Sequence, residues 1–497
     1  MTSQEKDLAT ITHIDEVEVG KGNLDAVSTT FVEPNAKALS SGLRKLDCYF
    51  LPAVTMIYFL SFLDRSNIGN AKAAGLQADL GLSDYQYSMA LTLTYIPYIL
   101  AEMPLTLLLR VVGPNILMPT LMVIWGVVTM CQGFVTNYVG LVLCRVFLGA
   151  AEGAIIPACI TYLATFYRRQ DLGKRTAFFF CATSLAGAFS GLLAAAILKM
   201  EGVAGKRGWM WIFIIEGLIT AVYGMISFFI LPNNPTVVGY WTEEEREAVL
   251  LALDNDRPVE ETHEAFSAKA VLGALAAPQM WLIATTLFCS GVSLFAMAYF
   301  SPSIVGSSLG YTGIKVQLYS VPPYAVSTVI SLACSWYSDK LNMRGPFIVG
   351  STFLSLIGYA IYYCSAATDK SARYVSLFFM ISGAYIAAPL LSVWMSNNHQ
   401  GYYRRISAVV MGFVFSNAGG ILSTWLFPKA QAPNYKKGTS ILLAMSSTLI
   451  AVAAIAMAYL HIRNKQKAAK GGFTEERGTL DDTVALGDRS VHFKYTL

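Results

Sequence analysis

Twelve stretches of mostly apolar residues follow one another along the chain, and each is about as long as a membrane is thick. A helix of roughly 20 apolar residues covers the hydrocarbon core of a bilayer, because each residue adds about 1.5 Å. We therefore expect the chain to cross a membrane as twelve helices. The predicted spans are residues 48–73, 85–109, 116–135, 139–167, 176–198, 210–231, 280–305, 316–337, 347–366, 374–396, 406–427 and 440–462.

The composition agrees with lipid as the main solvent of this fold. Hydrophobic residues make up 55% of the chain and charged residues only 14%, whereas soluble domains carry about 25% charged residues. The net charge of +4 is small, and no basic run interleaved with aromatics suggests a nucleic-acid partner. The eight cysteines lie in apolar stretches without paired spacing, which favours packing residues over a metal site or a disulfide framework.

The central polar stretch carries a helix signal of its own. Thr242 and Glu245 have the spacing of a capping box, which predicts a helix that runs to Asp254. A solvated linker helix is the favoured interpretation, and a regulatory docking site is the alternative. The polar start of the chain lacks the pattern of a signal peptide, so the first apolar helix is expected to remain as a span.

The two sets of six spans are nearly equal in length, which indicates an internal duplication. Arg175 opens the fifth span and Arg405 opens the eleventh, and small residues follow each at similar offsets. We predict five segments. They are a disordered cytoplasmic N-terminal tail (1–44), a six-helix bundle (45–231), a cytoplasmic central loop (232–278), a second six-helix bundle (279–463) and a cytoplasmic C-terminal tail (464–497).

Basic residues close to span ends predict the orientation, because such residues favour the cytoplasmic side. Arg110, Arg168, Arg175, Lys340 and Arg404 lie on one set of loops. The termini and the central loop fall on the same side as this set. We expect a multi-pass protein, in the plasma membrane, with both termini in the cytoplasm.

The first half carries charged residues inside its apolar stretches. A charge at the centre of a bilayer costs about 2.5–3.5 kcal/mol on insertion scales, so it is expected to face a cavity or a partner. The second half is almost free of such charges, which suggests that the first half handles charge while the second shapes the pocket. The charged residues are Asp64, Arg65, Glu102, Arg145, Glu152 and Glu216.

The fourth span places several of these features on one helical face. Arg145, Gly149, Glu152 and Gly153 are separated by offsets that return to the same side of a helix. The arginine and the carboxyl lie about 10 Å apart along the axis, which is too far for a direct bond. The two glycines form a step that lets another backbone approach, and Pro157 is expected to kink the helix beyond them.

Each charged residue has a functional and a structural interpretation. Arg65 is a candidate anchor for an anion, since a guanidinium grips a carboxylate with two bonds; the alternative is a local network with Asp64. Arg145 is a candidate substrate contact or a structural ion pair. Glu152 is a candidate for proton coupling, because burial favours the protonated carboxyl whereas a nearby arginine favours the ionised one. Asp64 and Glu102 are further proton-coupling candidates, with structural acids as the alternative.

Polar side chains in the second half supply the remaining candidates. Tyr299 and Tyr385 are candidate substrate contacts, although aromatics in spans are often packing or interface residues. Asn417 is also a candidate, and a contact point between helices is its alternative. Glu216 is interpreted as polarity within the packing near the outer interface.

Several motifs together resemble the major facilitator superfamily, specifically its anion:cation symporter branch. They are Leu63 to Gly69 (LDRSNIG), Tyr98 to Pro104 (YILAEMP), Arg145 to Pro157 (RVFLGAAEGAIIP), Trp209 to Gly217 (WMWIFIIEG) and Ser338 to Arg344 (SDKLNMR). Within that branch, these motifs resemble those of fungal allantoate, nicotinate and vitamin permeases. The resemblance covers roughly residues 45–465.

The resemblance implies an all-α fold of two pseudo-symmetric six-helix bundles that rock around a central site. It also implies uptake of a small carboxylate together with protons. Arg65 matches an arginine that relatives use for the substrate anion, and Arg145 and Glu152 match a pair tied to binding and proton coupling. The seventh span lacks the arginine of the vesicular glutamate branch, which favours a singly charged or amphiphilic anion.

Two transport functions remain open at this point. The first is proton-coupled import of a carboxylate, ureide or vitamin by alternating access, and the second is export of a fungal metabolite by the same fold. An enzyme or a receptor is disfavoured, because the chain has no metal-binding helix motif and no phosphate-binding loop. We expect no cofactor and no metal. The expected partners are the substrate anion, protons and the lipid bilayer, with the protein as a monomer.

Overall fold

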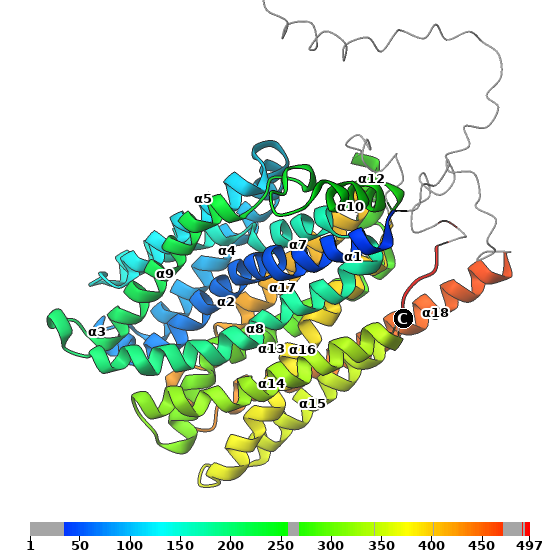
Figure 1. Cartoon of the computed structure of the whole chain (residues 1–497). Coiled ribbons are helices and arrows are strands. Elements are labelled where there is room, and N and C mark those ends of the chain that lie inside the picture. The colour runs from blue at the N-terminus through cyan, green and yellow to red at the C-terminus, as the bar shows by residue number, and fades with distance from the viewer. Residues whose placement is uncertain (1–33, 257–267, 342, 401, 471–489, 491–492) are drawn as a thin grey trace, which may run out of the picture. The chain divides into compact units, whose positions relative to one another are not determined.

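The computed structural model describes residues 34–256, 268–341, 343–400, 402–470, 490 and 493–497 (Figure 1). These residues form helices and no β-strand. Most of the predicted N-terminal tail and part of the predicted C-terminal tail lie outside the described residues.

Twelve long helical elements correspond to the twelve predicted spans. In the first half they are α2 (Leu51–Ala73), α4 (Asp84–Val112), α5 (Pro114–Gln132), α6 (Tyr138–Glu152) with α7 (Ile155–Phe166), α8 (Arg169–Ile197) and α9 (Gly208–Ile230). In the second half they are α13 (Pro278–Leu309), α14 (Ile314–Leu341), α15 (Gly345–Cys364), α16 (Lys370–Asn397), α17 (Tyr402–Ser423) and α18 (Lys436–Ala469).

Shorter helices join or precede these elements. They are α1 (Ala36–Lys45), a π-helical turn (Leu46–Phe50), α3 (Leu76–Asp79), α10 (Glu243–Asp256), α12 (Ala268–Leu275) and four 3₁₀ turns (Leu198–Met200, Val203–Gly205, Pro235–Val237 and Lys429–Gln431).

Ten candidate spans among the described residues are long and apolar enough to cross a membrane. The two long helices outside this set are α4 and α14, and both pack against the opposite half of the chain. A helix covered by protein can carry polar side chains that lipid would not tolerate. In α14 these include the buried serines Ser320, Ser327, Ser331 and Ser335.

The helix pairs of the two halves repeat each other. In the first half α5 packs on α9, α4 on α6 and α2 on α8; in the second half α15 packs on α18, α14 on α16 and α13 on α17. The halves meet where α8 lies against α14, α4 against α17 and α2 against α13. This pattern is the one that an internal duplication predicts, and it gives two six-helix bundles.

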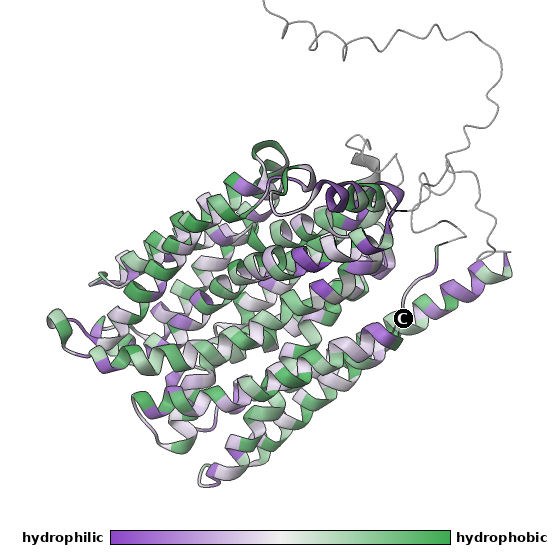
Figure 2. Ribbon diagram, in the orientation of Figure 1, coloured by the Kyte–Doolittle hydropathy of each residue, from purple (hydrophilic) through white to green (hydrophobic). Residues whose placement is uncertain are grey.

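Hydrophobic residues run along the length of the helices, and hydrophilic residues gather toward the helix ends (Figure 2). The first turn of α2 and the last turns of α4, α16 and α18 lie at one end of the bundle, together with α1 and α10 (Figure 1). We call this the terminal end, and the opposite end the far end.

The fourth span is broken into α6 and α7 by a turn at Gly153 and Ala154. Pro157 has no N–H to bond the carbonyl of Gly153, so the helical ladder is interrupted at this point. The predicted kink at Pro157 therefore takes the form of a break just before it. The turn follows Glu152 directly, which places that carboxyl at a helix end.

The glycine step predicted in the fourth span is confirmed. A side chain at Gly149 would clash with the backbone carbonyl of Thr94, and one at Gly153 would clash with that of Tyr98. The missing side chains let α6 lie directly on α4. Close contact between α4 and α6 fixes the position of Glu152 along the helix axis relative to Tyr98.

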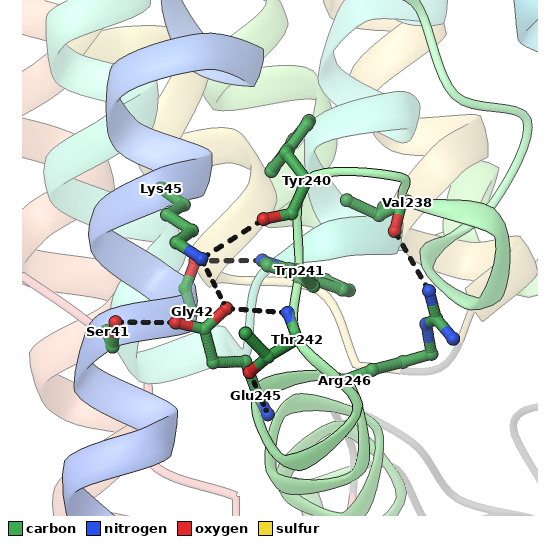
Figure 3. A network of polar contacts seen from close by, with 9 residues as sticks. All are labelled: Ser41, Gly42, Lys45, Val238, Tyr240, Trp241, Thr242, Glu245 and Arg246. Carbon is green, nitrogen blue, oxygen red and sulfur yellow. Dashed lines mark hydrogen bonds and ion pairs between the residues drawn. The ribbon is translucent and has the colours of Figure 1, made fainter.

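The first helix begins earlier than predicted, at Ala36 within the segment expected to be a disordered tail. It is ordered because it packs on α10. Trp241 donates a hydrogen bond to the Gly42 carbonyl at 3.1 Å, and Lys45 forms an ion pair with Glu245 at 2.7 Å (Figure 3). The predicted capping box of α10 is confirmed, since Thr242 and Glu245 exchange both hydrogen bonds. The helix continues past the predicted end at Asp254 to Asp256, where this described range stops.

Glu245 is expected to control how firmly α1 docks on α10. The Lys45 ammonium and the Ser41 hydroxyl beside it lower the pKa of Glu245 to about 2. Because this pKa is below the usual value near 4.5, the contact stabilises docking above about pH 4.5 and is lost as the pH falls toward 2. At pH 7, Glu245→Gln should speed amide hydrogen exchange in α1 about threefold, the scale of a surface ion pair.

The matched control is Glu243→Gln, because Glu243 pairs only with Arg246 of its own helix at 2.8 Å among the contacts seen here. Exchange in α1 that is equally slow in Glu245→Gln and in the parent protein would show that the carboxylate does not hold the helix.

Candidate functional site

A small cavity of about 30 Å³ lies between the two halves of the chain. Arg65 of α2 and Asn417 of α17 are among its polar lining residues, and aromatic side chains form much of its wall. The aromatic residues are Tyr58, Phe62, Phe180, Phe295 and Phe413. The cavity therefore combines one cation with an apolar enclosure.

Arg65 has capacity to bind an anion at this cavity. Its Nε lies 3.5 Å from Glu152 Oε2, and both side chains are less than a tenth exposed. The Nη1 and Nη2 atoms are buried and make no hydrogen bond to a described residue. The guanidinium lies 4.7 Å from the Tyr98 ring centre and 5.5 Å from that of Phe295. The aromatic faces favour the cation, while the two free nitrogens match the spacing of a carboxylate.

Glu152 reaches Arg65 and not the arginine of its own helix. Its Oε2 faces Arg65, and its Oε1 is buried without a hydrogen bond to a described residue. Arg145, two turns earlier, lies with its guanidinium 5.8 Å from the Phe213 ring centre. It is buried and does not line the cavity, and its charge interacts with Tyr299 of the second half as well as with Glu152. The ion pair within 4.0 Å therefore joins Glu152 to Arg65, while Arg145 acts on Glu152 from a longer distance.

Asp64 also points away from the cavity, because it precedes Arg65 by one residue and a helix turns about 100° between neighbours. Its carboxylate accepts hydrogen bonds from Trp125 Nε1 at 2.9 Å and from Asn67 Nδ2 at 3.3 Å. Glu216 is fully buried in the same half. These acids belong to the interior of the first bundle.

Glu102 and Asn417 meet across the boundary between the halves. The Asn417 amide lies beside the Glu102 carboxyl, although no hydrogen bond within 3.5 Å joins them. Both side chains are nearly inaccessible to solvent. The predicted candidates Arg65, Glu152, Glu102 and Asn417 therefore surround one region at the centre of the molecule.

The two tyrosine candidates flank this region on the second half. Tyr299 of α13 shares a hydrogen bond of 2.7 Å with Tyr95 of α4, so it links the halves directly. The Tyr385 ring packs edge-on against Phe62 at 6.2 Å and against Tyr324 at 5.3 Å. Neither tyrosine lines the cavity itself.

The aromatic partners of Arg65 were not among the predicted site residues. Tyr95, Tyr98 and Glu102 follow one another at offsets of three and four residues, which places them on one face of α4. Phe62 and Arg65 share a face of α2 in the same way. A search for aromatic side chains one turn from each charged residue would have found both sets.

The far end is closed by contacts between the halves. Thr92 and Thr424 share a hydrogen bond of 2.9 Å, and Gln317 donates one of 3.2 Å to the Asn70 carbonyl. A side chain on Gly69 would clash with the backbone carbonyl of Tyr299. The α2 and α13 backbones are therefore in contact on the far-end side of the cavity.

The terminal end is open in contrast. A second cavity of about 510 Å³ lies there, lined by α4, α7, α12 and α17 together with Asn233 and Asn234. Most of its lining is apolar, as at Met103, Val410 and Met411. We call this cavity the vestibule. It begins at Met103, one residue after Glu102.

Gly69→Val is expected to prevent the far end from closing, because its side chain needs the space of the Tyr299 carbonyl. Overpacking costs about 1–3 kcal/mol, so the closed population should fall about tenfold. Labelling of a Thr92→Cys reporter by an impermeant maleimide, with the exposed Cys48, Cys131 and Cys364 replaced by serine, measures this change. The control is Gly350→Val, since a Cβ on Gly350 meets nothing within 4 Å. Equal labelling of the folded Gly69→Val and control proteins would contradict the assignment of this contact as the closure.

Two six-helix halves around a central site, closed at one end and open at the other, are the architecture of a known transporter group. The sequence profile of the Major Facilitator Superfamily matches residues 54–424. The chain belongs to this superfamily. Its members are transporters and not enzymes, and the apolar helices make this one a multi-pass membrane protein.

Curated relatives of this superfamily member are fungal transporters. An uncharacterized transporter of Schizosaccharomyces pombe is 32% identical, over 95% of this chain and 96% of its own. The high-affinity nicotinic acid transporter of Saccharomyces cerevisiae is 32% identical, over 91% of this chain and 84% of its own. A major facilitator-type transporter of Emericella nidulans is 30% identical, over 98% of this chain and all of its own.

Solved structures of the superfamily share the fold. A bacterial homologue of the human lysosomal transporter Spinster, inward-facing and unoccupied, has a TM-score of 0.62 at 16% identity, covering 85% of this chain and 97% of its own. The proton:xylose symporter bound to 6-bromo-6-deoxy-D-glucose has a TM-score of 0.63 at 14% identity, covering 82% and 95%.

Proposed function

We propose that this protein takes up a small organic anion together with protons by alternating access. The observation that carries the proposal is the buried Arg65–Glu152 pair, in which the guanidinium keeps two nitrogens free at the central cavity. A buried, partly satisfied cation needs an anion, because an uncompensated charge in a protein interior is costly. A substrate carboxylate satisfies that need.

Coupling follows from competition for one guanidinium. Arg65 is the only cation that lines the central cavity among the described residues, and it neutralises one carboxylate at a time. A substrate carboxylate that binds Arg65 displaces Glu152, and Glu152 then takes a proton, since two adjacent carboxylates cannot both stay ionised. Glu102 beside the vestibule offers a second position for that proton on its way to the terminal end.

The remaining predicted contacts shape the pocket in this proposal. Asn417 donates to the substrate, and Tyr299 and Tyr385 support the aromatic wall. Asp64 and Arg145 act from within the first bundle, where they tune the charge that Arg65 and Glu152 experience. We also propose that the protein works as a monomer in the plasma membrane, and that the terminal end, with both termini, faces the cytoplasm. The vestibule then opens inward.

Uptake of labelled anions at several external pH values tests the proposal. The panel contains monocarboxylates, ureides and vitamins, with nicotinic acid included because a relative at 32% identity transports it. Acid-stimulated uptake of at least one anion that a protonophore abolishes is the expected result. Failure to take up any of them, with a metabolite retained in cells that lack the protein, would favour an exporter instead.

A further inference from the structure

The last residues of the described chain, Phe493–Leu497, form a docked segment on the second half. The Thr496 backbone donates a hydrogen bond to Asn398 Oδ1 at 2.9 Å and accepts one from Asn398 Nδ2 at 3.1 Å. Trp394 Nε1 donates a third bond to the Thr496 carbonyl at 2.9 Å. Trp394 and Asn398 are both fully buried. The end of α16 is therefore built to hold an extended peptide.

Helix α18 binds the docked segment at Tyr495, the residue before Thr496. Asn464 accepts a bond from the Tyr495 N–H and donates one to the Tyr495 carbonyl, both at 2.9 Å. Lys467 Nζ donates to the Phe493 carbonyl at 2.9 Å and lies 4.1 Å from the Tyr495 ring centre. Tyr495 itself is only 3% exposed. The successive residues Tyr495 and Thr496 thus bind different helices, as in an extended strand whose neighbouring residues face opposite sides.

A third contact ties the docked segment to the loop between α14 and α15. The Arg344 backbone N–H donates to the Leu497 carbonyl oxygen at 2.6 Å. The Arg344 side chain bonds Ser338 at 3.0 Å and forms an ion pair with Asp339. The docked segment therefore connects α16, α18 and this loop at the terminal end.

The helix that holds Thr496, α16, also contributes to the wall of the central cavity. Ala388, Pro389 and Ser392 of this helix line the cavity, and Trp394 follows two residues later. Pro389 has no N–H for the Tyr385 carbonyl, so the helix is weakest at this point. The docked segment holds the part of α16 that lies beyond the weak point.

We propose that Phe493–Leu497 is a regulatory segment that stabilises the state with an open vestibule by fixing the terminal end of α16. Its release frees α16 to bend at Pro389 and shifts the protein toward closure of the vestibule. The proposal rests on the alternating-access part of the proposed function, and it is independent of the substrate and the coupling ion.

Hydrogen exchange of the full-length protein in nanodiscs tests the docking. The amides of Tyr495 and Thr496 should be protected in the parent protein. Asn398→Ala should speed their exchange at least about tenfold, because it removes two buried hydrogen bonds. Lys494→Ala is the matched control, since Lys494 is exposed between the two anchors. Fast exchange of both amides in the parent protein would overturn the proposal.

A reporter in the vestibule tests the effect on conformation. Ser407 lines the vestibule, and Ser407→Cys is labelled in a background in which the exposed Cys48, Cys131 and Cys364 are serine. Adding Asn398→Ala, or Tyr495→Ala as a second variant, should slow labelling several-fold. Unchanged labelling in variants whose segment has lost protection would also overturn the proposal. Neither measurement uses a transported anion, so failure of the proposed substrate class would leave both results interpretable.

Discussion

Replacing Arg65 by lysine is expected to raise the substrate KM by about 10- to 100-fold although the charge is kept. An ammonium is a point charge that cannot supply two parallel bonds, and each lost hydrogen bond to a charged group costs about 1.5–3 kcal/mol. The free Nη1 and Nη2 atoms of Arg65 are the donors that lysine lacks. Initial rates of acid-stimulated uptake over a range of substrate concentrations measure the change.

The matched control for this variant is Arg463→Lys, because Arg463 is exposed near the end of α18. It should transport like the parent protein. A lysine at position 65 that leaves KM unchanged would mean that the substrate anion binds elsewhere. Surface expression of each variant must be measured, since breaking a buried ion pair also destabilises the fold.

Replacing Glu152 by glutamine is expected to abolish pH-driven net uptake while exchange of internal for external substrate continues. Glutamine keeps the shape of the side chain but has no proton to gain or lose. In the parent protein, the return of the empty carrier requires Glu152 to restore its pairing with Arg65. The variant lacks that partner, so only the substrate-loaded carrier should reorient. Net uptake should fall about 100-fold or more, the usual scale for a positioned proton-transfer group.

Parallel assays of net uptake and of counterflow measure both parts of this prediction. Glu244→Gln on the surface of α10 is the control, because its side chain is exposed. Net uptake that keeps its full pH dependence in Glu152→Gln would remove this carboxyl from the coupling mechanism. Equal loss of net uptake and counterflow would assign it to substrate binding alone.

The sequence predicted the fold well because lipid imposes strict rules. Each span needs a continuous apolar stretch, so twelve helices could be counted before any contact was known. The ends of the helices were predicted less well, because the length rule does not fix where a span starts. The structure describes α17 from Tyr402 to Ser423, whereas the predicted span was residues 406–427. The glycine step on α6 was predictable because two glycines one turn apart on a membrane helix usually allow a second helix to approach closely.

The site was predicted as a set of residues but not as a set of contacts. Helical spacing placed Arg145 and Glu152 on one face, yet it does not state which helix faces them. Tertiary packing brings Arg65 of α2 into an ion pair with Glu152 and leaves Arg145 without a carboxylate within 4.0 Å among the described ion pairs.

The structure of the two predicted tails could not be predicted either, because it depends on residues far away along the chain. Order in α1 depends on Trp241 and Glu245, about 200 residues away along the chain. The docked segment depends on Asn398, about 100 residues away. A polar composition predicts a solvated tail, and only the presence of matching groups elsewhere makes such a segment fold back.

Proton movement coupled to the substrate is the most direct test of the account. The purified protein is placed in liposomes that contain a pH-sensitive dye, and the transported anion is added outside without a pH gradient. We predict that the anion acidifies the interior through the parent protein and that it does not do so through Glu152→Gln. Entry of the anion without acidification, or equal acidification by both proteins, would contradict a carrier that works through the Arg65–Glu152 pair.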